Sequence, residues 1–266
     1  MRIREIVNAL EQFAPLPLQD GFDNAGMQLG LTDAETTGAL LCLDVTEPVV
    51  NEAIALRCNL IISHHPLLFH GVKSITGHNY VERCILKAIR NDIAIYSAHT
   101  NLDNAQGGVN YKIADKLGLK NIRFLVSKPT TITGHLTDSG SGVIGELPQE
   151  EHEMDFLHRI KRAFDVPCVR YNRCETDKPI RTVALCGGAG AFLIPDAIAN
   201  GADAFLTGEI RYHEYFGREQ EILLVEIGHY ESEQYTREIL FNYLDATCPG
   251  LKIYQTNVNT NPINYL

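Results

Sequence analysis

Residues 39–65, ALLCLDVTEPVVNEAIALRCNLIISHH, combine two apolar runs with an amphipathic stretch between them. The runs at 39–44 and 60–62 have the length and composition of buried strands, and 48–57 has the spacing of a helix. A strand, a crossover helix and a second strand in such short order predict a βαβ unit with parallel strands. This stretch therefore places the chain in the α/β class.

The same alternation continues along the rest of the chain. A more β-rich and polar stretch interrupts it near residues 123–147. Further helices are predicted at residues 2–13, 80–90, 109–117, 151–164, 194–199 and 231–245, and further strands at 92–97, 168–171, 203–207, 222–228 and 251–256. Helices that alternate with strands in this way indicate mixed or parallel sheets packed by helices.

The opening stretch has a counterpart later in the chain. It lies without a gap over residues 183–209, VALCGGAGAFLIPDAIANGADAFLTGE, and several residues coincide: Leu41, Cys42, Ala53, Ile54 and Ala55. At a second offset, residues 93–103 lie over 223–233, which sets His99 on His229 and Asp103 on Glu233. The match indicates an internal repeat. Two halves related by a pseudo-twofold axis would bring matching strand ends to one cleft.

The repeat also suggests how the chain is divided. We expect a first α/β half at residues 1–122 and a second at 179–266. Residues 123–178 form a β-rich and helical linking region between them. The parts are expected to associate closely as one globular unit.

Composition limits the classes of function. The 266 residues are 45% hydrophobic and 21% charged, as in an ordinary globular protein. A net charge of −10 and a pI near 5.4 argue against nucleic acid as a partner. We expect no membrane association, because no apolar run reaches the length of a span and the start, MRIREIVNALEQF, reads as an amphipathic helix. Seven cysteines without a CxxC pair predict reduced core thiols in a cytoplasmic protein.

Two adjacent histidines, His64 and His65, end the second apolar run, and Pro66 follows at once. Neighbouring side chains on a strand point to opposite faces, so both rings reach one site only where the strand has ended. The residue before a proline is biased away from helix, which favours such an ending. Ligand sites of α/β proteins commonly lie at these strand ends.

The repeat supplies the other candidate metal ligands. His229 and Glu233 share one face at the start of a predicted helix, while Asp103 is expected in the turn after His99. Imidazoles mixed with carboxylates suit Zn, Fe, Mn, Co or Ni, and a bridging carboxylate allows two divalent ions. The alternatives are a surface pair on a helix and a turn aspartate. Glu209, opposite His65 in the repeat, is either a supporting partner or a structural ion pair.

Other polar features have two interpretations each. His99 and His213 are candidate catalytic residues that line the cleft as general acid, general base or substrate contact. The CGGAG stretch at 186–190 is either a phosphate-binding turn at a helix start or a tight glycine turn, and the second is favoured. The early DGFDNAG stretch at 20–26 has the composition of an ordinary loop.

Six motifs together give the chain a resemblance to a known family. They occur in the order DNAGMQLG, ISHHPLLFHG, SAHTNLDNAQGGVN, CGGAG, TGEIRYHE and IGHYESE. The chain resembles the GTP cyclohydrolase I type 2 homologue family, whose eukaryotic members are named for an interaction with a transcription factor. It departs from the family at Phe22, where a tryptophan is common, and its length is that of the short form without an inserted domain.

The resemblance implies a dinuclear metal site and a toroidal homohexamer built as a trimer of dimers. It implies these metal ligands, with Glu233 as the bridge: His64, His65, Asp103, His229 and Glu233. The expected function is that of a metal-dependent hydrolase acting on a nucleotide-like or other small substrate, with cyclohydrolase activity on GTP as one form. The alternative is a ring-shaped metal-binding scaffold, regulator or metal chaperone without turnover.

Overall fold

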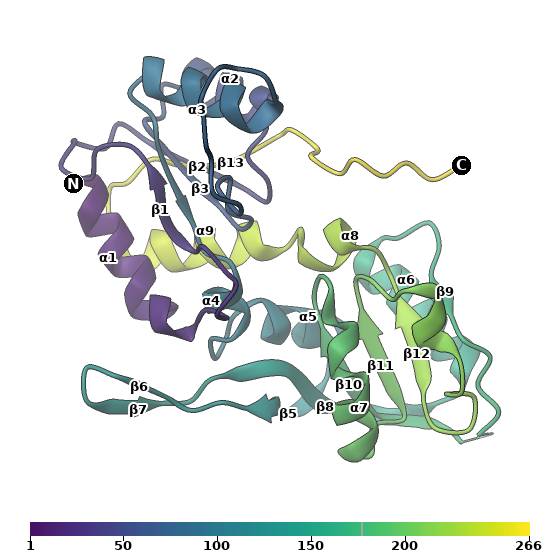
Figure 1. The fold of residues 1–266 in the computed structure, drawn as a ribbon. Coiled ribbons are helices and arrows are strands. Elements are labelled where there is room, and N and C mark those ends of the chain that lie inside the picture. The colour runs from purple at the N-terminus through teal and green to yellow at the C-terminus, as the bar shows by residue number, and fades with distance from the viewer. Residues whose placement is uncertain (177) are drawn as a thin grey trace. The chain divides into compact units, whose positions relative to one another are not determined.

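The computed structural model describes residues 1–176 and 178–266 and has a mixed α/β fold (Figure 1). Contacts divide the described residues into two compact units. Unit 1 contains residues 1–102 and 236–264, and unit 2 contains the described residues of 103–235 together with 265–266. The chain thus returns to unit 1 near its end.

Unit 1 is built on a five-stranded sheet with the order β1-β4-β3-β2-β13. Its strands are β1 (Gly26–Leu29), β2 (Ala39–Cys42), β3 (Leu60–Ser63), β4 (Ala94–Ser97) and β13 (Ile253–Gln255). Its helices are α1 (Ile3–Phe13), the short η1 (Leu16–Leu18), α2 (Glu47–Leu56), α3 (Tyr80–Arg90) and α9 (Thr236–Thr247). All neighbouring strands are parallel except β1, which runs antiparallel to β4.

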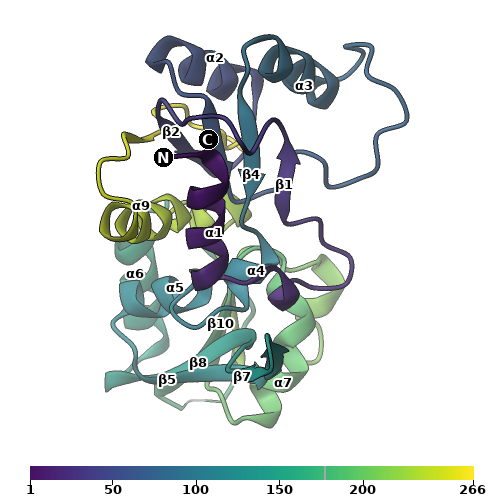
Figure 2. The ribbon, with the colours of Figure 1, turned by 90° about the vertical axis from the view of Figure 1, so that its left-hand side faces the viewer.

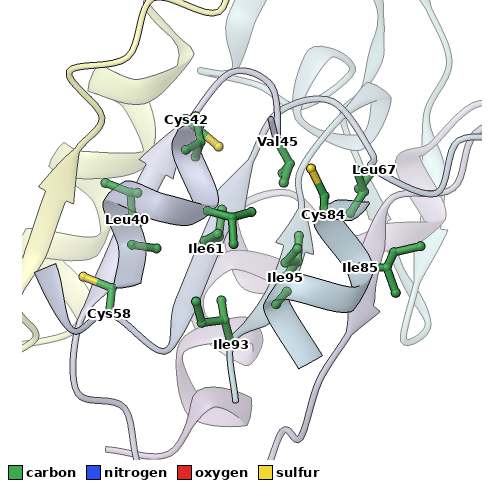
Figure 3. Close-up of a cluster of buried hydrophobic side chains, with 14 residues drawn as sticks. Leu40, Cys42, Val45, Cys58, Ile61, Leu67, Cys84, Ile85, Ile93 and Ile95 are labelled. Carbon is green, nitrogen blue, oxygen red and sulfur yellow. The ribbon is translucent and has the colours of Figure 1, made fainter. Parts of the chain in front are cut away.

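Helices α2 and α3 lie side by side over the sheet of unit 1 (Figure 2). Apolar residues from both helices pack against strand residues such as Leu40, Ile61 and Ile95 (Figure 3). Strands β2, β3 and β4 are buried along their whole length, which explains their continuous apolar sequences. This core fixes the position of the residues that follow each strand.

Unit 2 contains a six-stranded mixed sheet with the order β5-β8-β10-β11-β12-β9. Its strands are β5 (Lys120–Ser127), β8 (Gly140–Glu151), β9 (Arg170–Tyr171), β10 (Ile180–Cys186), β11 (Ala204–Thr207) and β12 (Leu223–Glu226), and β6 (Thr130–Ile132) and β7 (His135–Thr137) form a separate hairpin. Its helical elements are α5 (Val109–Leu117), α6 (Glu153–Phe164), η2 (Gly190–Leu193), α7 (Ile194–Ala199), η3 (Tyr212–Tyr215) and α8 (His229–Glu233). The short α4 (Thr100–Asp103) follows β4.

Each sheet contains three adjacent parallel strands, β2-β3-β4 in unit 1 and β10-β11-β12 in unit 2, and the register of these strands tests the repeat. In β2 and β3 Ala39 pairs with Leu60, and in β10 and β11 the aligned Val183 pairs with Ala204. The first offset is therefore confirmed. The second offset is wrong by one residue within the strand, since Leu60 pairs with Ala94 but Ala204 pairs with Leu223. The extra residue of the second copy lies between β12 and His229, where Gly228 has a φ of 99°.

The structure also corrects several expected elements. The helix expected at 231–245 is two helices, because α8 ends and the chain passes from unit 2 to unit 1 before α9 begins. The loop expected after His99 is the one-turn α4, which Asp103 ends. Strand β1 was not expected, because its four residues begin with a glycine, are followed by Gly30 and are paired only on one side.

The observed division of the chain differs from the expected boundaries at 122/123 and 178/179. Contacts separate the units after Leu102 and before Thr236. The reason is long-range pairing: β13 adds to β2 and thereby returns the end of the chain to unit 1. Strand β5 adds to β8 and holds the expected end of the first half in unit 2.

Two further expectations concern thiols and membranes. All seven cysteines are free, and Cys42, Cys58, Cys84 and Cys248 are buried as expected. Cys168 is exposed, because it lies just outside the edge strand β9 rather than in the core. Among the residues that the structure describes, every helix is too short or too polar to cross a bilayer.

Candidate metal centre

His64 follows β3 directly and is fully buried. Its Nδ1 lies 2.7 Å from the carbonyl oxygen of Ala98. A carbonyl can only accept, so Nδ1 carries the ring proton and Nε2 carries the lone pair. The backbone after β4 thus sets the tautomer that a metal ligand needs.

His65 is oriented by a carboxylate rather than by the backbone. Its Nδ1 lies 2.7 Å from Oδ1 of Asp44, and the Thr260 hydroxyl donates to the other oxygen at 2.6 Å. Burial raises the pKa of the Asp44 carboxyl, but the hydrogen bond and charge of His65 and the bond from Thr260 outweigh it, so the pKa lies below its ordinary value. The charged carboxylate keeps the proton on Nδ1 and leaves a lone pair on Nε2 of the neutral ring, which could bind a metal ion.

His99 is held in the same way by Asp23. Its Nδ1 lies 2.7 Å from Oδ1 of Asp23, and the other oxygen accepts the amide and the hydroxyl of Thr100. Burial raises the pKa of Asp23, but these hydrogen bonds and the charge of His99 lower it to about 2. The carboxylate lies in the stretch 20–26 that composition describes as an ordinary loop.

These three rings form a histidine cluster in unit 1, consisting of His64, His65 and His99. Their centroids lie 4.9 to 5.4 Å apart, and one nitrogen from each lies within 4.8 Å of the others. The sequence assigned His99 to catalysis alone, yet its geometry also suits a nitrogen ligand. Three imidazoles gathered at strand ends are a common binding site for divalent transition metals.

Unit 2 contributes a carboxylate cluster, consisting of Asp103, His229 and Glu233. The Nδ1 of His229 lies 2.7 Å from Oε1 of Glu209, and its Nε2 lies 3.1 Å from Oε2 of Glu233. A carboxylate oxygen of Asp103 lies within 4.8 Å of one of Glu233. Glu209 therefore contacts the ring of His229, as both interpretations of this residue require.

The geometry around His229 fits a cation. A neutral imidazole has one proton, which Glu209 draws to Nδ1, so Nε2 and the Glu233 oxygen face each other with lone pairs. That arrangement is repulsive unless positive charge neutralises it, either as a second ring proton or as a metal ion. Two ligand atoms 3.1 Å apart can both lie about 2.1 Å from one ion.

Gly188 makes room for the buried Glu233 carboxylate. Its φ is +58°, and a Cβ at this position would lie 2.3 Å from Oε1 of Glu233. A side chain here would therefore be strained and would also displace the carboxylate. The glycine is needed for space as much as for conformation.

Asn110 connects Asp103 to the same glycine turn. Its side-chain amide donates to the Asp103 carbonyl at 3.1 Å, and its oxygen accepts the Gly187 amide at 2.9 Å. Asn110 is buried on the first turn of α5. This bridge ties the position of Asp103 to the turn that packs on Glu233.

The turn at 186–190 uses its amides inside the protein. Those of Gly187, Gly188 and Gly190 donate to the side chains of Asn110, Ser232 and Thr207. Groups already paired in this way are not arranged as a phosphate cradle. The structure supports the interpretation as a tight glycine turn.

His213 lies apart from both clusters in its contacts. It is exposed in η3, and its ring packs against Tyr212 and Phe216. Its catalytic role stays a prediction. Sequence reasoning missed Asp23, Asp44 and Asn110 as positioning residues, although Asp44 lies at the end of the decisive strand and could have been noticed there.

The comparisons with known proteins identify one family. The family model described as Duf34/NIF3 (NGG1p interacting factor 3) matches residues 1–262. A Clostridium perfringens protein named GTP cyclohydrolase 1 type 2 homolog is 35% identical over 236 residues, covering 88% of this chain and 87% of that protein. A Lactococcus lactis protein of the same name is 33% identical and covers 98% of both.

Solved structures give the same result. The crystal structure of a Staphylococcus aureus hypothetical protein superposes with a TM-score of 0.90 at 30% identity. The match covers 100% of this chain and 99% of that one. The α/β fold and its element order are therefore shared over the full length.

Proposed function

Because this chain belongs to the Duf34/NIF3 family, we propose that it binds two divalent metal ions. The ligands in this proposal are His64, His65, Asp103, His229 and Glu233, with Glu233 as the bridge. Zn, Fe, Mn, Co and Ni all accept such a mixture of nitrogen and oxygen ligands.

One observation carries the proposal. Each proposed histidine ligand is hydrogen-bonded at Nδ1 by an acceptor, 2.7 Å away in every case. The acceptors are the Ala98 carbonyl, Asp44 and Glu209. Such support fixes the tautomer and the direction of a metal-binding ring, and in each neutral ring it leaves a lone pair on Nε2.

The proposed activity is hydrolysis of a nucleotide-like or other small substrate. A bound pair of divalent ions supplies a water acidified toward neutral pH and a clamp on the reacting group. Cyclohydrolase-type attack on GTP opens the imidazole ring at C8 and releases formate. His99 would transfer protons at Nε2, because Asp23 holds its other proton on Nδ1, and His213 is the second candidate for that role.

Two further properties belong to the same proposal. The protein would act as a homo-oligomer, a toroidal hexamer in the form implied by the family. It would work in the cytoplasm, consistent with seven free thiols.

Metal content per chain tests the proposal on untagged protein purified without added metal. We expect about two equivalents in the wild type, since a bridging carboxylate implies a metal pair. His65→Ala and Glu233→Ala should each lose metal while keeping the circular dichroism of the wild type. Glu150→Ala removes an exposed carboxylate from β8 and should retain all metal.

Turnover then separates the enzyme from the binding scaffold. Formate release from GTP that disappears in Glu233→Ala but persists in Glu150→Ala would support a hydrolase. A full complement of metal without turnover of GTP or related nucleotides would favour the non-catalytic scaffold, regulator or metal chaperone. Unchanged metal content in both ligand variants would contradict the metal centre itself.

A further inference from the structure

A pocket of about 480 Å³ lies at the edge of the unit 2 sheet. One wall is the stretch around β9, which pairs with β12 (Figure 1), and the other is the stretch around η3. Six of the lining residues carry the argument: Arg170, Tyr171, Arg173, Tyr212, Phe216 and Glu219. Its volume lies in the range of small-molecule sites.

The frame of the pocket is firmly held. Glu226, at the end of β12, accepts hydrogen bonds from Arg170 at 2.8 Å, the Tyr215 hydroxyl at 2.9 Å and the Ile210 amide at 3.2 Å. Asn172 bonds in both directions with the strand that contains Leu224. Both walls are thereby tied to the same strand, so the pocket is formed before any ligand binds.

The surface of the pocket is unusually aromatic. Tyr212 and Phe216 expose 68% and 58% of their surface, and Tyr171 exposes 44%. The rings of Tyr212 and Phe216 lie 5.2 Å apart at an angle of 78°. These exposed rings at one pocket offer flat apolar faces on which a planar ligand can stack.

The polar groups at the pocket narrow the class of ligand. Arg173 is a widely exposed donor whose ion pair with Glu175 contributes little at the surface, and Glu219 supplies acceptors. Aromatic faces with donors and acceptors match a nucleobase, which stacks by its face and hydrogen-bonds by its edge. We propose that this pocket binds the base of a free mononucleotide.

The pocket shares its framework with the carboxylate cluster of unit 2. The segment that contains Tyr212 follows Glu209, which is hydrogen-bonded to His229. The chain also runs from Glu226, the last residue of β12, directly to His229. A nucleotide in the pocket is therefore anchored on the segments that position this metal ligand. The role of the pocket as the substrate subsite rests on the proposed function, whereas the binding of a nucleotide in the pocket does not.

Calorimetric titration of the purified protein with GMP, AMP and UMP, and with inorganic phosphate alone, tests the proposal. We expect a nucleotide to bind and phosphate alone not to bind. Tyr212→Ala should weaken nucleotide binding about tenfold or more, as loss of a stacking partner does. Tyr212→Phe keeps the ring and should restore affinity, and Phe192→Ala, an exposed aromatic residue outside the pocket lining, should leave it unchanged.

Metal content and molecular mass are measured on each variant. Absence of nucleotide binding, or equal affinity in Tyr212→Ala, overturns the pocket even if the metal pair is present. Nucleotide binding without bound metal supports the pocket and contradicts only the metal hydrolase. A change of oligomeric mass in Tyr212→Ala, without nucleotide binding to the wild type, identifies the surface as a contact between chains and overturns the proposal.

Discussion

The two units contain the same three parallel strands but use the ends of those strands differently. After β2 comes Asp44, whose carboxylate orients His65. The aligned position after β10 is Gly188, which has no side chain and makes room for Glu233. At this position the first copy has a carboxylate that orients a histidine, and the second leaves space that the carboxylate of Glu233 occupies.

The contrast shows how two copies of one repeat can carry different polar residues at the ends of their strands. The buried strands retain the same pairing register, since both copies must fill the same kind of core. The residues just beyond the strands are free of that constraint. The first copy has three imidazoles and one carboxylate there, and the second has one imidazole and one carboxylate.

Placing a side chain at position 188 should have the largest effect. Gly188→Ala is expected to abolish metal binding at Glu233, because the new Cβ would occupy the space of Oε1. Metal content after purification measures the loss. Gly201→Ala is the matched control, since Gly201 also has a positive φ but has nothing within 4 Å of the added atom. Equal metal content in the two variants would contradict the proposed packing role.

Removing the support from His65 should have the next largest effect. Asp44→Asn keeps the shape but removes the charge, and we expect metal affinity about 10- to 100-fold weaker. Competition with a chelator of known affinity measures the change. Thr260→Val removes only the 2.6 Å bond to Asp44 and should give a smaller loss. An effect of Thr260→Val as large as that of Asp44→Asn would contradict this order.

The equivalent change in unit 2 should be weaker. Glu209→Gln removes the charge beside His229, but the Glu209 side chain is 58% exposed and that of Asp44 is 34% exposed. Water screens the exposed pair more strongly, so its loss should reduce metal affinity less than Asp44→Asn does. The same chelator competition compares them. A larger loss of metal affinity in Glu209→Gln than in Asp44→Asn would contradict this explanation by solvent screening.

The smallest effect should appear as a pH dependence of stability. The folded pKa of Asp23 is about 2, below the unfolded value of about 3.9, so its stabilisation is present above pH 4 and is lost as pH falls toward 2. Urea unfolding of chelator-treated protein should show Asp23→Asn destabilised at pH 7. The difference from wild type should narrow at pH 3. A difference that is constant across this range would assign the effect to packing.

Much of the fold follows from local patterns. The helices at 80–90 and 109–117 and the strand at 60–63 have periodic or continuous apolar sequences, so their positions are apparent without tertiary context. Strand β1 has neither, and its formation depends on pairing with β4, more than sixty residues away. The split into α8 and α9 depends on where the chain leaves unit 2, which periodicity does not record.

Some residues of the candidate site can also be recognised from local sequence, and others only from the fold. His64 and His65 are recognisable from the sequence, because two adjacent side chains can reach one site only where the strand has ended. Asp23 is not, because its partner His99 is 76 residues away and only the fold brings the two together. Ligands at strand ends were thus predictable, and the carboxylates that orient them were not.

Diffraction data collected above and below the absorption edge of the bound metal would locate the metal ions and their ligands. A bridged metal pair predicts two anomalous peaks about 3.5 to 4 Å apart, with Glu233 bonded to both. The histidine cluster and the carboxylate cluster should each supply ligands. A single peak bound by His64, His65 and His99 alone, with Glu233 uncoordinated, would contradict it.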